Sequence, residues 1–266
     1  GAPRARPILC TLLVALFAMP AHSQTLGTTD AVGVDSFKNA LLDLDFDAGT
    51  VTPRNTDNFT LQKINTVELG PNRCSSRVDA FVADRDGGKV LRYPNAAGAG
   101  DLVCDPASSD CPIAPNGLSR NSVKVLAVGD KGVRNRDAAR VWVVPPENCP
   151  ADTFSPPALL DPEICVTDPR NGRCLDPDAV VDVEFINRPV GGFDTDALLV
   201  LTQQPTALMH YPAPLVACTV AGESCDEAGD PETLLVFTNR SDRRPSGLAM
   251  LPGGEVLVSF DDGFIK

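Results

Sequence analysis

Clustered carboxylates are the first residues of this chain whose types and spacing could do chemistry. Asp84 and Asp86 lie in one predicted turn, and Asp261 and Asp262 lie in another. Carboxylate oxygens are hard donors, so four of them converging from two turns would suit a divalent cation such as calcium. Ordinary Asp-Gly turn formation explains the same residues equally well, because Asp side chains accept hydrogen bonds from nearby backbone amides. Both interpretations stay open.

A second acidic segment resembles the start of a calcium-binding loop. Asp43, Asp45 and Asp47 alternate along the chain, as the first ligands of such a loop do. An EF-type loop also needs Gly at its sixth position and Glu at its twelfth, where this chain has Ala48 and Arg54. The alternation instead favours a strand with one solvated, acidic face.

The histidines limit the chemistry further. The chain has two, and His22 lies in an N-terminal segment that we expect to be removed. His210 would then be the single imidazole, within the apolar run Ala207–Pro212 that predicts a strand. It is either a strand residue or a catalytic base. The sequence contains no Gly-x-Ser-x-Gly, no phosphate-binding loop and no His-Glu-x-x-His.

Residues 1–23 have the pattern of a secretory signal peptide. Arg4 and Arg6 precede the apolar run Ile8–Met19, and Ala21-His22-Ser23 places small residues at a cleavage site. That run would rise only about 18 Å as a helix, against a hydrocarbon core of about 30 Å. The sequence therefore predicts a secreted or periplasmic protein with no integral membrane segment after removal of the signal.

The cysteines fit export. Cys10 lies in the predicted signal peptide, which leaves an even number of cysteines for an oxidising compartment. No Cys-x-x-Cys spacing is present, so structural disulfides are expected instead of zinc thiolates. The pairing that closes the shortest loops joins Cys104 to Cys111, Cys165 to Cys174 and Cys218 to Cys225, and leaves Cys74 to pair with Cys149.

Charge and composition exclude some partners. The formal net charge is −12, and without Arg4 and Arg6 it becomes 21 − 35 = −14. Such acidity argues against nucleic acid or an anionic membrane as the main partner. With 24 Pro, 21 Gly and 5% aromatic residues, the chain should consist of many short elements joined by turns.

An internal repeat organises these elements. Apolar segments rich in β-branched residues recur with separations of 60, 58 and 58 residues, and they centre on Val82, Trp142, Val200 and Val258. The pairs Tyr93-Pro94 and Tyr211-Pro212 lie 118 residues apart, which is twice 59. The chain is therefore expected to contain four units of about 59 residues.

The third unit predicts a complete module of short strands. These cover 180–186, 197–202, 206–211 and 233–238. Equivalent first strands are expected at 61–69, 123–128 and 247–251. In the second unit, Pro145-Pro146 and Pro156-Pro157 fall where a third strand is expected, which puts that unit in question. Repeated four-stranded antiparallel modules predict an all-β fold of the β-propeller type; an irregular β-sandwich remains if the repeat is accidental.

One stretch resembles a known family. Pro245-Ser246-Gly247-Leu248 through Gly253-Gly254 and Val256-Leu257-Val258, followed by Asp262-Gly263, is similar to a blade of NHL-type or gluconolactonase-like propellers. The segment from Arg77 to Tyr93 is similar from its second strand onward. The resemblance implies that residues 61–266 form propeller units.

The chain is expected to be part of a larger propeller, because it begins without Met and stops inside the predicted third strand of the fourth unit. Alternatively, the N-terminal segment 24–60 closes the ring by supplying strands to the last blade. Leu41–Asp47 has the alternation that such a strand needs.

Two function classes follow. The first is an exported, disulfide-stapled propeller that binds an extracytoplasmic protein, a glycan or a small molecule. The second, implied by the gluconolactonase resemblance, is a lactonase-like or esterase-like hydrolase in which a divalent cation polarises the ester carbonyl and a carboxylate assists water. No catalytic residue is assigned by this resemblance.

Overall fold

The computed structural model describes most of the chain from residue 31 onward. The described residues are 31–35, 38–54, 59–94, 100–104, 111–132, 139–161, 164–189, 192–212, 231–237, 244–263 and 265. The predicted signal peptide and the Cys218–Cys225 pair lie outside them. All regular elements in these ranges are strands, and no helix capable of crossing a membrane is found there.

The strands form a series of antiparallel sheets along the chain. A three-stranded sheet comes first, with β1 (Ala31–Asp35), β2 (Ala40–Asp45) and β3 (Thr50–Pro53). The first four-stranded sheet contains β4 (Ile64–Pro71), β5 (Val78–Asp84), β6 (Lys89–Pro94) and β7 (Asp101–Cys104). The second contains β8 (Pro115–Arg120), β9 (Leu126–Asp130), β10 (Arg140–Val144) and β11 (Ala158–Asp161).

A short hairpin separates the second four-stranded sheet from the third. It consists of β12 (Val166–Thr167) and β13 (Cys174–Leu175). The third four-stranded sheet contains β14 (Ala179–Phe185), β15 (Leu198–Gln203), β16 (Ala207–Tyr211) and β17 (Glu232–Val236). The described elements end with the pair β18 (Pro245–Met250) and β19 (Val256–Phe260).

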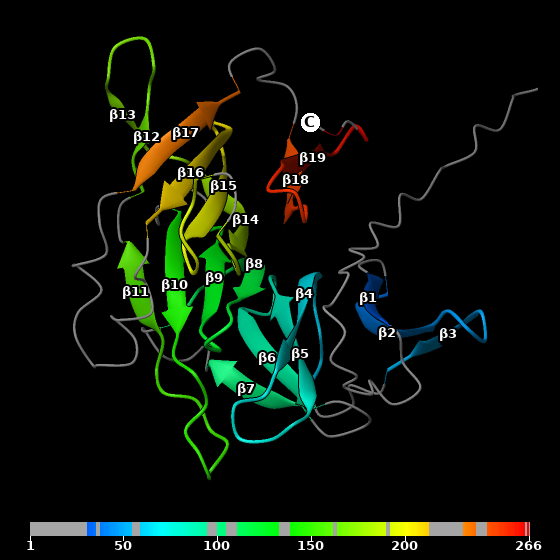
Figure 1. Cartoon of the computed structure of the whole chain (residues 1–266). Helices are drawn as coiled ribbons and strands as arrows, with labels where there is room; N and C mark the ends of the chain where they lie inside the picture. Colours follow the sequence, from blue (N-terminus) through cyan, green and yellow to red (C-terminus); the bar gives the residue numbers. More distant parts are fainter. Residues whose placement is uncertain are drawn as a thin grey trace, which may run out of the picture.

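The sheets are arranged as the blades of a propeller. The first strand of each sheet contacts the first strand of the next, in the order β1, β4, β8, β14 and β18 (Figure 1). Each sheet runs outward from this axis in chain order, so neighbouring sheets meet face to face. The all-β propeller fold expected from the sequence is confirmed.

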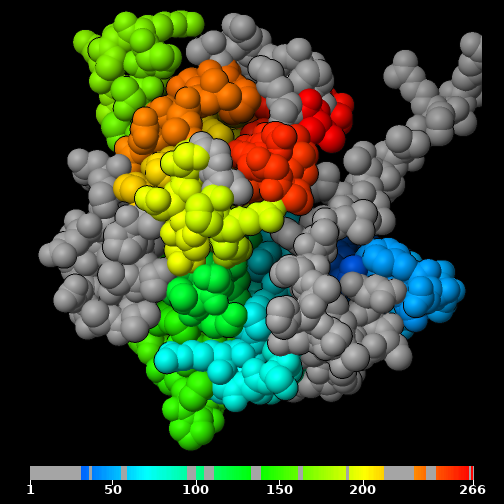
Figure 2. All heavy atoms as spheres, in the orientation of Figure 1, coloured from blue at the N-terminus to red at the C-terminus, as the bar shows by residue number. Residues whose placement is uncertain are grey.

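Apolar side chains fill the joints between neighbouring blades. Leu41, Ile64 and Tyr93 are fully or almost fully buried between the three-stranded sheet and the first four-stranded sheet. Similar clusters fill the next joints, and β12–β13 and β2–β3 project from the body (Figure 2). Burial of this kind stabilises the fold by roughly 25 cal/mol per Å² of apolar surface.

Four of the first strands begin with the same irregularity. The pairing with the second strand shifts by one residue, as in a β-bulge, and the extra residues are Asn65, Asn116, Val181 and Ser246. The shared bulge shows that these four sheets are equivalent units.

The structure corrects the strand assignment predicted for the second unit. Trp142 lies in β10, the third strand of its sheet, whereas the sequence repeat placed it in a second strand. Residues 123–128 were expected to form the first strand, but β9 is the second, and β8 was missed. The separations of about 59 residues therefore compared unlike strands. The doubted unit is a complete sheet, because both proline pairs lie in the loop between β10 and β11.

The N-terminal segment also differs from the alternative drawn from its sequence. Leu41 lies in β2, as the alternation predicted, but β1, β2 and β3 form a sheet of their own beside β4. The described part of the last blade contains only β18 and β19. Within the described residues, the segment thus forms a sheet of its own, and none of its strands pairs with β18 or β19.

Candidate ligand site at the propeller axis

Three acidic residues lie on the first strands β4 and β14, close to the propeller axis. Glu68 belongs to β4, and Asp182 and Glu184 belong to β14; we call these three the axial carboxyls. Each of these three residues is partly exposed to solvent. Enclosure by the neighbouring strands raises the pKa of Glu68 to about 8 and that of Asp182 to about 7.

The axial carboxyls influence one another. Burial raises the pKa of Glu184 well above its ordinary value, and repulsion by Glu68 and then Asp182 raises it further. The Asp182 charge also raises the pKa of Glu68, although less than burial does. Because like charges this close disfavour joint ionisation, the three groups form one electrostatic cluster.

Two of these carboxyls receive hydrogen bonds from β8. The backbone N–H of Arg120 bonds to Glu68 and lowers its pKa in part. The Ser119 side chain bonds to Glu184 with the same effect, and its hydroxyl oxygen accepts the backbone N–H of Phe185 at 2.9 Å. Strand β8 therefore positions acidic groups from both of its neighbours.

Asp182 is occupied by the backbone. Its Oδ1 accepts the N–H of Val183 at 3.0 Å, and its Oδ2 accepts the N–H of Leu248 in β18 at 2.8 Å. Both oxygens therefore stabilise the fold, the second by joining two blades. This leaves Glu68 and Glu184 as the axial carboxyls best suited to meet a ligand.

An asparagine bulge ties three first strands together near this cluster. The Asn116 amide nitrogen donates to the carbonyls of Val180 at 3.0 Å and Val181 at 2.8 Å. Its amide oxygen accepts from Asn65, and its backbone carbonyl accepts the Thr66 hydroxyl at 2.6 Å. These bonds fix β4, β8 and β14 relative to one another and so fix the strands that carry the axial carboxyls.

The predicted metal ligand Asp84 has a structural role. It is fully buried at the end of β5, and its Oδ1 accepts the backbone N–H groups of Gln62 at 3.0 Å and Lys63 at 2.7 Å. Asp130 stands at the same position of the next blade and accepts those of Ile113 and Ala114. In both blades the aspartate at the end of the second strand bonds the segment that precedes the first strand, so this contact is not the local Asp-Gly turn bonding considered from the sequence.

The other predicted metal ligands are exposed. Asp86 pairs with Arg85 at 2.9 Å, and Asp261 and Asp262 lie in the turn after β19. No three His, Cys, Asp or Glu side chains in the described ranges are grouped to hold a metal ion. A calcium site built from the four aspartates therefore stays a prediction.

Two further residues from the sequence analysis lie on strands. Asp43 is in β2 and pairs with Arg54 at 2.6 Å, so an arginine lies where a calcium loop would need its last ligand. His210 lies in β16, half-buried, with its ring 4.9 Å from that of Phe193. Burial lowers the pKa of His210 below its ordinary value.

Three of the four predicted cysteine pairs are brought to disulfide distance. The Cα atoms are 5.3 Å apart in Cys74–Cys149, 5.9 Å in Cys104–Cys111 and 5.1 Å in Cys165–Cys174. Three such pairs fit an oxidising, extracellular environment.

Comparison with known proteins supports the fold. No protein-family model matches the sequence, and no curated protein matches it. Among solved structures, a putative gluconolactonase matches with a TM-score of 0.54 and 15% identity, over 86% of this chain and 67% of its own. A gluconolactonase from Xanthomonas campestris, described as important in glucose secondary metabolic pathways, matches with a TM-score of 0.54 and 10% identity, over 86% and 65%.

A third similar structure is the calcium structure of a family AA12 carbohydrate-active enzyme from Trichoderma reesei. Its TM-score is 0.53 and its identity 12%, over 88% of this chain and 79% of its own. The chain thus spans about two thirds of the length of the two gluconolactonase structures. At these identities the likeness is one of fold, and the chain is a β-propeller whose structure is similar to those of gluconolactonase-like proteins.

Proposed function

We propose that this protein is an exported, disulfide-stapled β-propeller that binds a ligand at the propeller axis. The observation that carries the proposal is that Glu68 in β4 and Glu184 in β14 lie on the two first strands that flank β8 and repel each other electrostatically. The ligand would be part of an extracytoplasmic protein, a glycan or a small molecule. Export is supported by the N-terminal signal pattern and by the disulfides.

The protonation of the axial carboxyls suggests what the ligand presents to them. Because the pKa of Glu68 is about 8 without a ligand, its carboxyl group is mostly protonated at neutral pH. A protonated carboxyl both donates and accepts hydrogen bonds, which suits hydroxyl or amide groups. A cationic group would instead favour the ionised form and displace the proton.

A divalent-metal-dependent lactonase or esterase is the second candidate. It is favoured by the fold likeness to gluconolactonases, and calcium would be the expected ion. Binding is the better supported of the two, because Asp84 Oδ1 and both oxygens of Asp182 are already bonded to backbone amides. A metal site would have to use other oxygens or give up these bonds.

Calcium titration with thermal melting tests the proposal and separates the candidates. The secreted protein would be compared with its Glu68→Gln, Glu184→Gln and Asp261→Ala variants, with and without millimolar calcium. An ion that binds only the folded state raises the melting midpoint. A rise lost in Asp261→Ala would support the aspartate site and justify assays with lactone substrates.

Calorimetry with a panel of neutral and amino sugars completes the test. Binding that is lost in Glu68→Gln and Glu184→Gln but kept in Asp261→Ala would support the axial site. Amino sugars should also release protons, which shows as a buffer-dependent binding enthalpy. If wild-type protein binds no member of the panel and is not stabilised by calcium, both small-molecule candidates fail and a protein partner remains.

A further inference from the structure

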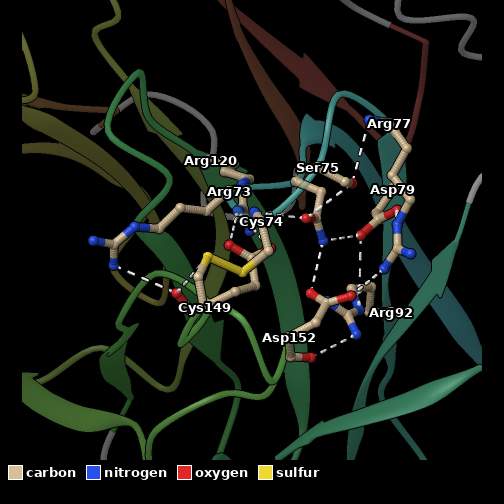
Figure 3. Close-up of a disulfide and its surroundings, with 11 residues drawn as sticks. Arg73, Cys74, Ser75, Arg77, Asp79, Arg92, Arg120, Cys149 and Asp152 are labelled. Atoms are coloured by element: carbon tan, nitrogen blue, oxygen red, sulfur yellow. Dashed lines mark hydrogen bonds and ion pairs between the residues drawn. A yellow bond between two sulfur atoms is a disulfide. The ribbon is translucent and has the colours of Figure 1, made fainter.

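One disulfide joins two blades through their loops. Cys74 lies in the loop between β4 and β5, and Cys149 lies in the loop between β10 and β11 (Figure 3). The two cysteines are 75 residues apart in sequence. We call this bond, together with residues 72–77 and 145–157, the clasp. The other two described disulfides span only 7 and 9 residues.

Asp152 anchors the second loop of the clasp to the first blade. Its Oδ1 accepts hydrogen bonds from Asn72 at 2.9 Å and from Arg92 at 2.6 Å. Its Oδ2 accepts from Arg77, and its backbone carbonyl accepts from Arg92 at 3.1 Å (Figure 3). One aspartate of the loop therefore satisfies three side chains of the neighbouring blade.

The charges beneath the clasp are buried. The Arg92 side chain is 3% exposed, and Asp79 beside it is fully buried. The Arg120 Nη2 donates to both carboxylate oxygens of Glu147 at 2.7 Å, and these two side chains are 1% and 0% exposed. Glu147 precedes Cys149 by two residues, so the disulfide holds in place the segment that neutralises Arg120. Buried charges depend strongly on such partners.

The clasp disulfide is more exposed to solvent than the Cys104–Cys111 disulfide. Cys149 is exposed and Cys74 is half-buried, whereas Cys104 and Cys111 are buried at 4% and 6%. A thiol reagent must reach a sulfur atom along the axis of the S–S bond, so access controls the rate of reduction. The bond between two blades is thus more accessible than the bond within one blade.

We propose that the Cys74–Cys149 bond is a redox-sensitive switch that locks or releases the joint between the first two four-stranded blades. A dithiol reductant attacks the exposed sulfur of Cys149, and Cys74 leaves as a thiolate that takes up a proton. The second thiol of the reductant resolves the mixed disulfide, which yields two protein thiols and one oxidised dithiol. Loop 145–157 then separates from the first blade, and water reaches Arg92 and Asp79.

Opening of the clasp also affects residues near the propeller axis. Glu147 bonds the Arg120 side chain, and the backbone N–H of Arg120 bonds Glu68. Movement of loop 145–157 therefore alters the end of β8 that supports an axial carboxyl. This route makes the clasp a means of regulation, although the switch itself does not depend on the proposed ligand.

Graded reduction with dithiothreitol, followed by alkylation and peptide mapping, tests the order of opening. We expect Cys74 and Cys149 to be labelled at reductant concentrations that leave Cys104 and Cys111 unlabelled. Under the same conditions, hydrogen exchange of amides in 72–77 and 145–157 should rise by about tenfold or more. The melting midpoint should fall by about 10 °C, since a long closed loop is released.

A matched control separates this effect from reduction in general. The double variant Cys165→Ser/Cys174→Ser removes an equally accessible disulfide that closes only the β12–β13 hairpin, and its midpoint should keep the full response to reductant. The variant Cys74→Ser/Cys149→Ser should lose most of that response. If it does not fold, partly reduced wild-type protein provides the same readout. Simultaneous labelling of all four cysteines, or unchanged exchange in 145–157 after reduction, would overturn the proposal.

Discussion

The two joints on either side of the second four-stranded blade are built differently. The joint with the first blade combines an apolar cluster around Phe81 with buried ion pairs and the clasp. The joint with the third blade is a larger apolar cluster that includes Phe185 and Tyr211. There the backbones approach so closely that a Cβ atom on Gly117 would lie 2.5 Å from the Asp182 Cα. The first joint, which we call the ionic joint, contains buried ion pairs, whereas the second, the apolar joint, depends on close packing.

This difference determines how each joint fails. Arg120 lies over the Phe81 ring at 4.5 Å, and its charge is tolerated there because Glu147 neutralises it. Removing one partner leaves an unpaired charge in a dry environment, whereas replacing both with apolar residues avoids the desolvation cost. The apolar joint has no such partner dependence, but it has little space for extra atoms.

Breaking the ionic joint should have the largest effect. Glu147→Ala is expected to lower the free energy of unfolding by about 4 kcal/mol, because Arg120 stays buried without its carboxylate. Urea denaturation measures this loss. The double variant Arg120→Met/Glu147→Leu should recover most of it. A single variant as stable as the wild type would show that Arg120 finds another partner.

Crowding the apolar joint should cost less. Gly117→Ala is expected to destabilise the protein by about 2 kcal/mol, since the new methyl group meets backbone atoms of β14. Gly33→Ala is the matched control, because its nearest neighbour would be a Leu44 side-chain carbon at 3.6 Å, an ordinary contact. Equal stability of the two variants would contradict the close approach.

The axial carboxyls should make stability depend on pH. The pKa values of Glu68 and Asp182 are raised in the folded protein, so the folded state binds more protons than the unfolded chain. Their contribution is therefore present at low pH and is lost as the pH rises from about 4 to about 8.

We expect the free energy of unfolding to fall by about 1 to 2 kcal/mol over this range. This is less than the pKa shifts alone would give, because these side chains keep some contact with solvent. Glu68→Gln should flatten the dependence, measured as melting midpoints across this pH range. A wild-type midpoint that does not fall toward pH 8 would show that the axial carboxyls are ionised in the folded protein.

Substitution of a residue at the solvent-exposed edge of the ionic joint should have the smallest effect on stability. Arg77 is 36% exposed, and it pairs with both Asp79 and Asp152. Arg77→Met is expected to cost about 0.5 to 1 kcal/mol, and the difference from wild type should shrink at about 1 M salt. Arg92→Met, which removes a 3% exposed guanidinium, should cost clearly more and be less affected by salt. Similar losses in the two variants would remove the distinction between rim and interior.

Sequence patterns predicted the strands whose side chains are mostly apolar. The strand around Val200 was expected at 197–202 and lies at Leu198–Gln203. Strand β8 was missed because Pro115-Asn116-Gly117-Leu118-Ser119-Arg120 contains one large apolar residue. Its Pro-x-Gly-Leu pattern does repeat that of Pro245–Leu248, and this similarity was the available signal.

The axial carboxyls were missed for a different reason. Glu68 and Glu184 each stand between two apolar residues, in Val67-Glu68-Leu69 and Val183-Glu184-Phe185, which is also the alternation of an ordinary half-exposed strand. Sequence alone does not show that both strands are first strands facing one axis. Asp84 was found from its turn, but its burial depends on the amides of Gln62 and Lys63, which belong to another strand connection.

The shared bulge has a consequence for how this architecture can be altered. Because the extra residue occurs at the same point in four first strands, each sheet presents the same starting geometry to its neighbours. Insertions elsewhere, such as the long connection between β10 and β11, leave that geometry unchanged. The outer strands and their connections should therefore accept grafted recognition loops without a change in the inner ring.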